Sequence, residues 1–188
     1  DKTYNFYEMI EEQARLCLLN IREKDIVFTV RFLDRFPQQV SGDSIRVAQI
    51  FQNILSNACK FTEQGTITLS LHCKMEEGQV WFDGCVEDTG VGMTKEKLAQ
   101  VFTEYVSFSE DMGVEGFGLG LSIVRQLVEM MHGWVRAESD PGKGTRVSFG
   151  FYQKQVPTEI SEPGNIGQEI LKEQSDPQVE EIQPNWVY

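Results

Sequence analysis

Three polar residues at helical spacing are the first candidates for chemistry in this chain. Asn53, Asn57 and Lys60 stand at i, i+4 and i+7, so on a helix they project from one side. Two carboxamides and an ammonium group on one surface suit a bound anion and its metal ion. The alternative is the solvated face of an amphipathic helix, because such polar stripes are common on surface helices.

A carboxylate at the end of a predicted strand is the second candidate. Asp88 shares its parity with Phe82 and Val86, so the strand that buries those residues also points this carboxylate inward. A buried carboxylate needs a partner, which is a backbone N–H, an arginine or a ligand donor such as an exocyclic amine. Gly90 and Gly92 follow directly, and their lack of a Cβ lets the backbone approach a flat ligand.

Two further glycine-containing stretches could contact a ligand. Gly116, Gly118 and Gly120 alternate at the start of a predicted helix, although each glycine costs a helix about 1 kcal/mol relative to alanine. The stretch is either a flexible loop or a cradle whose amides and helix dipole face phosphates. Thr145 follows a predicted hairpin turn at 141–144 and points inward, so its hydroxyl needs a hydrogen-bond partner.

Hydrophobic periodicity and turn residues predict the elements that position these side chains. The expected helices cover residues 5–20, 43–62, 94–102 and 119–131, and the expected strands cover 26–34, 66–74, 79–88, 134–138 and 145–151. Residues 37–42 are expected to form a break, and 103–115 a loop. This order predicts an α+β fold, a two-layer α/β sandwich with a mixed, mostly antiparallel sheet covered on one face by helices.

Local signals predict how two of these helices begin, pack and end. Asp43 or Ser44 is expected to cap the helix that carries Asn53. Gly133 is expected to cap the end of the last long helix. The apolar stripe of that helix is expected to consist of Leu119, Ile123, Leu127 and Met131.

Composition limits the partners and the compartment. The net charge of −12 over 188 residues disfavours a nucleic-acid or anionic-membrane partner. The four cysteines lie within apolar runs, so we expect buried free thiols in a reducing, cytoplasmic setting. No apolar run reaches transmembrane length, so we expect no direct membrane contact. The chain starts with Asp1 rather than Met, and we expect it to be a piece of a longer protein.

Taken together and in order, these motifs resemble the nucleotide-binding boxes of the sensor histidine kinase catalytic domain. They are Asn53-x3-Asn57-x2-Lys60, Asp88-x-Gly90-x-Gly92, Phe102, Gly116-x-Gly118-x-Gly120 and Gly142-x-Gly144-Thr145. That domain belongs to the superfamily shared with gyrase, a heat-shock chaperone and mismatch-repair ATPases, and it has the Bergerat ATP-binding fold. The resemblance covers residues 24–152.

The resemblance implies ATP and Mg²⁺ as ligands. Asn57 would hold Mg²⁺, Asn53 would support the metal and the phosphates, and Lys60 would contact phosphate. Asp88 would accept a hydrogen bond from the adenine amine, with Thr145 nearby. Residues 103–115 would form a lid over ATP. The implied nucleotide-binding set is Asn53, Asn57, Lys60, Asp88, Gly90, Gly92, Phe102, Gly116, Gly118, Leu119, Gly120 and Thr145.

The residue at position 53 favours one activity within the superfamily. The ATP-hydrolysing members and the anti-sigma serine kinases resemble one another in carrying Glu four residues before the metal-binding Asn, where it can act as a general base. Here that residue is Asn53, which cannot take a proton at neutral pH. We therefore expect a protein-histidine kinase of a two-component system, with Asn53 and Lys60 as catalytic residues. The alternatives are a degenerate nucleotide-binding signalling module and a hydrolytic ATPase of the same fold.

Two departures from the family pattern shape this expectation. His72 and His132 are the only histidines, and neither lies in the family's helical acceptor motif. The acceptor is therefore expected on a separate dimerisation domain, with a response regulator or receiver domain as a further partner. The lid holds four carboxylates and no base, so ATP affinity is expected to be modest and strongly Mg²⁺-dependent. These carboxylates belong to Glu104, Glu110, Asp111 and Glu115.

The resemblance also suggests a division of the chain. Residues 24–155 are expected to form the catalytic domain. Residues 1–23 are expected to be a helix that ends the connection from the dimerisation domain. Residues 156–188 hold four of the six prolines and seven acidic residues against one lysine, which is typical of a tail or linker.

Overall fold

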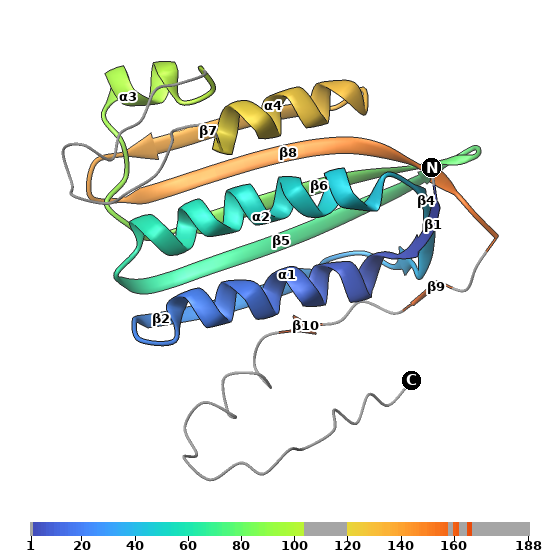
Figure 1. The fold of residues 1–188 in the computed structure, drawn as a ribbon, viewed down its shortest axis with the longest axis horizontal. Helices are drawn as coiled ribbons and strands as arrows, with labels where there is room; N and C mark the ends of the chain where they lie inside the picture. The colour runs from blue at the N-terminus through green and yellow to red at the C-terminus, as the bar shows by residue number, and fades with distance from the viewer. Residues whose placement is uncertain (1, 104–119, 158–159, 162–164, 167–188) are drawn as a thin grey trace, which may run out of the picture.

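The computed structural model describes residues 2–103, 120–157, 160–161 and 165–166. Its helices are α1 (Phe6–Ile21), α2 (Ser44–Phe61), α3 (Lys95–Gln100) and α4 (Gly120–Met130). Its strands are β1 (Lys2–Asn5), β2 (Asp25–Phe32), β3 (Phe36–Pro37), β4 (Gln39–Gly42), β5 (Gln64–Glu76), β6 (Gln79–Asp88), β7 (Trp134–Asp140), β8 (Gly144–Gln155), β9 (Ile160–Ser161) and β10 (Asn165–Ile166). Figure 1 shows α1, α2 and α4 side by side over the strands.

The main sheet has the strand order β1-β4-β8-β6-β5-β2-β10, and β7 also pairs with β8. β2 and β5 are parallel because the chain crosses through α2 between them, whereas the other described pairs are antiparallel. The predicted two-layer sandwich with a mostly antiparallel sheet is therefore confirmed. The register pairs Asp88 with Ile67 on one side and with Thr145 on the other, so this carboxylate lies at the end of three adjoining strands.

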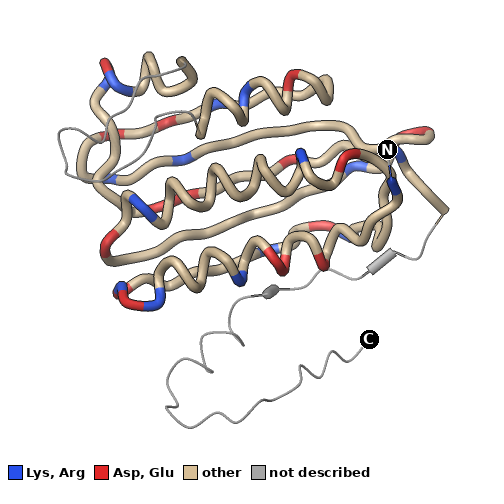
Figure 2. Tube along the Cα trace, in the orientation of Figure 1, with Lys and Arg blue, Asp and Glu red and all other residues tan. Residues whose placement is uncertain are grey.

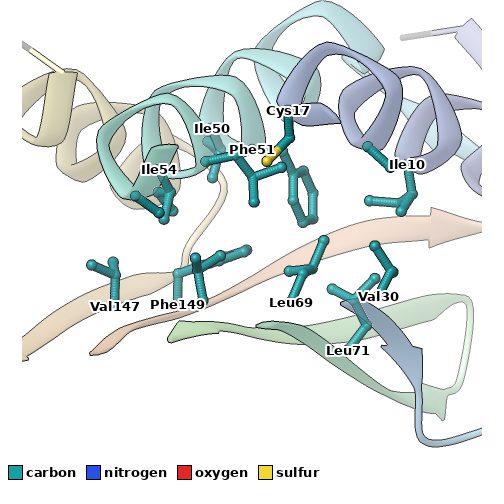
Figure 3. Packing of buried hydrophobic residues seen from close by; sticks show 14 of the residues in the cluster. Ile10, Cys17, Val30, Ile50, Phe51, Ile54, Leu69, Leu71, Val147 and Phe149 are labelled. Atoms are coloured by element: carbon teal, nitrogen blue, oxygen red, sulfur yellow. The ribbon is translucent and has the colours of Figure 1, made fainter. Parts of the chain in front are cut away.

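The core lies between the helices and the inner face of the sheet. Figure 3 shows Phe51 and Ile54 from α2 packed against the strands that carry Leu69 and Phe149. Complete burial of one such side chain contributes about 1.5–3 kcal/mol. Phe6 at the start of α1 is fully buried, and the centroid of its ring lies 4.3 Å from the centroid of the Phe82 ring on β6. A boundary at residue 24 would therefore divide a packed core, and the connecting role of residues 1–23 remains a prediction.

α2 is held at both ends by side chains outside its apolar face. Asp43 caps the first turn, since its Oδ1 accepts from Arg46 N at 3.1 Å, and this settles the choice between Asp43 and Ser44. At the other end Lys24 Nζ donates to the carbonyl oxygens of Cys59 and Thr62 at 2.8 and 2.9 Å. A cation there also complements the helix dipole. α2 is thus a rigid support for the polar residues on its surface.

The structure corrects the prediction of a break at residues 37–42. β3 begins at Phe36, and β4 spans Gln39–Gly42. β4 joins β1 to the far end of β8, through the pairs Val40↔Tyr4 and Val40↔Gln155. β9 and β10 also pair with β3 and β2, so parts of the expected tail 156–188 run along strands of the domain.

The predicted packing of α4 was partly wrong. Its buried face centres on Leu121, Val124 and Val128, with Leu127 beside them, whereas Ile123 is only half-buried. The predicted C-cap was also wrong, because His132 rather than Gly133 takes the left-handed conformation, with φ of 55°. Gly133 N then donates to Val128 O at 2.7 Å, which closes the helix.

The polar surface agrees with the sequence at some positions and not at others. His72 is exposed as expected, and its Nδ1 lies 3.0 Å from Asp34 Oδ2. All four thiols are free, but Cys73 and Cys85 are only half-buried, so the expectation of four buried thiols was wrong for these two.

Figure 2 shows acidic and basic positions interspersed along the described chain. None of its described helices is both long and apolar enough to cross a bilayer.

Candidate functional site

The carboxylate of Asp88 is the centre of a small polar recess at the end of β6. Its Oδ1 accepts from Gly90 N at 2.8 Å and from Thr145 N at 3.2 Å. We call Asp88, Gly90, Gly92, Ser139 and Thr145 the Asp88 recess. Both backbone hydrogen bonds are made to Oδ1, so Oδ2 can still accept a hydrogen bond from a ligand.

Burial raises the pKa of Asp88 above its ordinary value. The hydrogen bonds from Gly90 N and Thr145 N lower the pKa and offset part of this effect. Thr62 lies beside the same carboxylate and favours its charged form, yet its hydroxyl falls short of hydrogen-bond geometry with any described residue. Thr62 Oγ1 is buried, so it has unused hydrogen-bonding capacity next to the carboxylate.

The loop after Asp88 and the turn before Thr145 interlock through glycines. Gly92 has φ of 65°, and a Cβ there would collide with Asp140 O. Gly144 has φ of 91°, and a Cβ there would collide with Asp88 O. Gly142 N donates to Val91 O at 2.7 Å across the same contact. Both glycines are therefore required for the close approach of two backbones, which fixes the recess before any ligand arrives.

Ser139, which the sequence did not single out, joins the two halves of the recess. Its Oγ accepts from Met93 N at 2.8 Å and donates to Gly144 O at 2.8 Å. It also lies 3.0 Å from Thr145 Oγ1. The inward parity of Ser139 with Ala137 on β7 could have revealed it, but the predicted strand stopped at residue 138.

Asn53, Asn57 and Lys60 lie on α2 as predicted and are half-buried. We call these three residues the amide wall. Asn53 Nδ2 is buried and has no hydrogen-bond partner among the described residues. A buried amide without a partner costs free energy, so this group is suited to a ligand contact. Lys60 Nζ lies 5.1 Å from the ring centroid of Phe61.

The first residue of α4 lies beside the amide wall. A Cβ at Gly120 would stand 3.4 Å from Asn57 Nδ2 and 3.6 Å from Asn53 Oδ1. The N-terminus of α4, whose dipole attracts anions, therefore adjoins two carboxamides. The last turn of α2 also contacts the recess, since Val91 N donates to Phe61 O at 3.1 Å. The loop after Asp88 and the helix that carries the amide wall are thus joined at the last turn of α2.

α3 bounds the recess on a further side. Thr94 caps it, as expected, by accepting from Lys97 N at 3.4 Å. A cavity of about 560 Å³ lies between α3 and the strand ends, and its lining includes Leu98, Asp88, Ser139 and Thr145. The size matches that of common small-molecule sites.

The remaining predicted residues have different outcomes. Phe102 is half-buried and packs against the core just after α3. Gly116, Gly118 and Leu119 lie outside the described residues, as does the expected lid from residue 104 onwards. The acidic lid residues Glu104, Glu110, Asp111 and Glu115 are therefore also outside them.

Chemically, this arrangement offers acceptors at one end and anion-binding groups at the other. The Asp88 recess presents carboxylate and hydroxyl oxygens that suit a flat ligand bearing N–H donors. The amide wall and the start of α4 suit an anion. Position 53 holds a carboxamide, which cannot accept a proton from an attacking group at neutral pH. The geometry therefore favours binding and positioning over general base catalysis at this residue.

Comparisons with known proteins agree with this geometry. Residues 42–155 match the family model described as histidine kinase-, DNA gyrase B-, and HSP90-like ATPase. The chain is 36% identical over 144 residues to the adaptive-response sensory kinase SasA of Thermosynechococcus vestitus, covering 76% of this chain and 37% of that protein. It is 33% identical over 151 residues to hybrid signal transduction histidine kinase B of Dictyostelium discoideum, covering 78% of this chain and 8% of that protein.

A solved structure shares the fold as well. Full-length ShkA, in a crystal structure with AMPPNP, aligns with a TM-score of 0.67 at 28% identity over 82% of this chain and 32% of that chain. The chain spans well under half the length of the curated relatives it matches. The family model nevertheless covers more than half of the chain. The chain therefore belongs to the family of histidine kinase-, DNA gyrase B- and HSP90-like ATPases.

Proposed function

We propose that this domain binds ATP with Mg²⁺ and transfers the γ-phosphoryl group to a histidine on a separate dimerisation domain. The observation that carries the proposal is the position of Gly120, at the start of α4, next to the amides of Asn53 and Asn57 on α2. It brings the anion-attracting end of one helix to a wall of neutral and cationic donors. Phosphoryl transfer needs mainly this kind of positioning and charge neutralisation.

Each part of the site has a role in this proposal. Asp88 accepts from the adenine amine, and Gly90 and Gly92 leave room for the base. Lys60 contacts the phosphates, together with amides at the start of α4. The support lies in the free capacity of Asp88 Oδ2 and in the buried, unpartnered Asn53 Nδ2. The crystal structure of the similar ShkA with AMPPNP also supports a nucleotide ligand.

The residues present fit a magnesium ion. Asn53 and Asn57 carry hard carbonyl oxygens near the start of α4, and Mg²⁺ prefers oxygen ligands together with substrate phosphates. Asn57 would hold the ion and Asn53 would assist, and the bound ion would neutralise charge on the phosphates. Asn53 and Lys60 then act on the transferred group by orienting it. Neither residue acts as a base.

The acceptor distinguishes this proposal from its two alternatives. An imidazole needs little activation, so a site with Asn53 in place of a carboxylate is suited to a histidine acceptor. We infer that the histidine lies on a dimerisation domain and that a response regulator or receiver domain takes the phosphoryl group next. The domain would then comprise residues 24–155 together with the packed α1, and would work in the cytoplasm, where ATP is available.

The test mixes the domain with γ-labelled ATP, Mg²⁺ and a histidine-bearing dimerisation domain. We expect acid-labile label on that histidine, and none on a matched dimerisation domain whose histidine is changed to alanine. Without the dimerisation domain, we expect no label on this chain. Free phosphate in place of labelled histidine would indicate a hydrolytic ATPase. ATP binding with neither product would indicate a degenerate nucleotide-binding module.

A further inference from the structure

Ser139 makes three short contacts around one hydroxyl oxygen at the edge of the Asp88 recess. Its Oγ lies 2.8 Å from Met93 N, 2.8 Å from Gly144 O and 3.0 Å from Thr145 Oγ1. All three distances lie in the range of good hydrogen bonds. Ser139 is half-buried at the end of β7, where the loop after Asp88 and the turn before Thr145 meet.

Only one arrangement of protons satisfies all three contacts. Met93 N–H can only donate, so Ser139 Oγ accepts there. Gly144 O is a carbonyl and can only accept, so the single Ser139 proton is used on it. Ser139 then has no proton left for the third contact, and Thr145 must donate its hydroxyl proton to Ser139 Oγ.

This arrangement fixes the polarity of the recess toward a ligand. The hydroxyl proton of Thr145 is used in the hydrogen bond to Ser139 Oγ, so Thr145 Oγ1 presents only lone pairs to the cavity. Thr145 and Asp88 both line that cavity. Asp88 Oδ2 is also an acceptor, because the backbone donors of Gly90 and Thr145 both use Oδ1. The side chains of Asp88 and Thr145 therefore present acceptors only, which suits a ligand edge that carries N–H donors.

We propose that Ser139 is a specificity-determining positioning residue that sets Thr145 as an acceptor and so favours a 6-amino purine over a 6-oxo purine. The inference rests on the proposed nucleotide function of the same site. Ser139 acts through Thr145 and need not touch the base. In this proposal the acceptors of Asp88 and Thr145 both face the group at purine C6, where an amine has two protons to donate and a carbonyl oxygen has none. Without Ser139, the Thr145 hydroxyl can rotate and donate its proton to that carbonyl.

The experiment measures the dissociation constants of ATP and inosine triphosphate with Mg²⁺ by calorimetry. For Ser139→Ala we expect the preference for ATP over inosine triphosphate to fall about 3- to 10-fold, which is the worth of one neutral hydrogen bond. Ser139→Cys should act in the same direction, because a thiol is a weak donor and acceptor. If Ser139→Ala does not fold, the two dissociation constants are measured with Ser139→Cys instead. Ser148→Ala is the matched control, since that hydroxyl contacts Cys85 Sγ and not the recess.

A background without the Thr145 hydroxyl separates specificity from structural support. In a Thr145→Val chain, Ser139→Ala should leave the nucleotide preference unchanged, because the group through which it acts is gone. Equal weakening of both nucleotides by Ser139→Ala, or an undiminished effect in the valine background, would overturn the inference while leaving the proposed function intact. If the unmodified domain binds neither nucleotide, the proposed function and this inference both fall.

Discussion

The Asp88 recess and the amide wall present polar atoms in opposite states. In the recess, Asp88 Oδ1 and Ser139 Oγ already have their hydrogen bonds, and the two backbones interlock at Gly92 and Gly144. In the amide wall, Asn53 Nδ2 is buried and has no partner among the described residues. The recess is preorganised, whereas the wall has capacity that a ligand would satisfy.

This difference suggests that the recess and the wall have separate roles, one in ligand discrimination and one in phosphate stabilisation. A preorganised recess discriminates between ligands, since a mismatched group meets acceptors that cannot move. The wall, with the unpartnered amide of Asn53, instead gains interactions when charge arrives, which suits stabilisation of a reacting phosphate. We therefore expect changes in the wall to affect transfer most and changes in the recess to affect nucleotide choice most.

The largest effect is expected from the wall. Asn57→Ala should lower phosphoryl transfer about 100- to 1000-fold, the cost of losing one preorganised group at a reacting centre. The unfolding temperature without nucleotide should change little, because the side chain is only half-buried. Transfer of label to a histidine-bearing dimerisation domain measures the first quantity, and calorimetric melting measures the second. Gln52→Ala, on the exposed side of α2, is the matched control. Full transfer activity in Asn57→Ala would remove the wall from catalysis.

Asp88→Asn should lower ATP affinity about 10- to 100-fold, as expected for a lost hydrogen bond to a charged group. The amide oxygen can still accept from Gly90 N and Thr145 N, so the recess keeps its shape. The pKa of Asp88 is raised, so at neutral pH the fold disfavours the charged form, and the neutral variant should be at least as stable. Calorimetric titration and melting measure both, with Glu129→Gln, an exposed position on α4, as a control for charge. A marked loss of stability would show that the carboxylate supports the recess.

The raised pKa of Asp88 predicts how ATP affinity depends on pH. ATP would bind the ionised form of Asp88, so affinity is complete above the raised pKa of the free domain and falls as pH drops through it. The decline should approach tenfold per pH unit and should begin at a higher pH than an ordinary aspartate would give. Titrations of the wild-type domain between neutral and mildly acidic pH measure it, alongside Asp88→Asn. An equally steep decline in that variant would assign the effect to another group.

Sequence patterns predicted the local elements of the site well. The bounds of β6 and the inward parity of Asp88 followed from a turn signal and alternation, and α2 with a cap at Asp43 or Ser44 followed from spacing. These features depend on residues close together in the chain, where periodicity and capping chemistry are informative.

Features that depend on distant partners were not predicted. β4 is short and polar, and it becomes a strand because β1 and β8 supply partners from far along the chain. Ser139 lies at a strand end, and its importance comes from Met93, Gly144 and Thr145, which only the fold brings together. Tertiary context decides such positions, since local propensity for short polar strands is weak.

The smallest effect is expected at the end of α2, where Lys24 supports the helix that carries the wall. Its ammonium donates to Cys59 O and Thr62 O and pairs with Glu63 at 2.9 Å. Lys24→Met should lower the free energy of unfolding by about 1 kcal/mol, because water can replace part of these bonds. ATP affinity should change less than about twofold, the effect of a few tenths of a kcal/mol.

This last pair of measurements locates what holds the amide wall in place. Asn53 and Asn57 lie within α2, and the helix face behind them is anchored by the buried Ile50, Ile54 and Ala58. If that packing fixes the wall, the helix end can loosen without moving the amides. Lys74→Met, whose side chain is 75% exposed, is the control for losing a lysine charge. A tenfold loss of ATP affinity in Lys24→Met alone would instead show that the position of the wall depends on the hydrogen bonds at the end of α2.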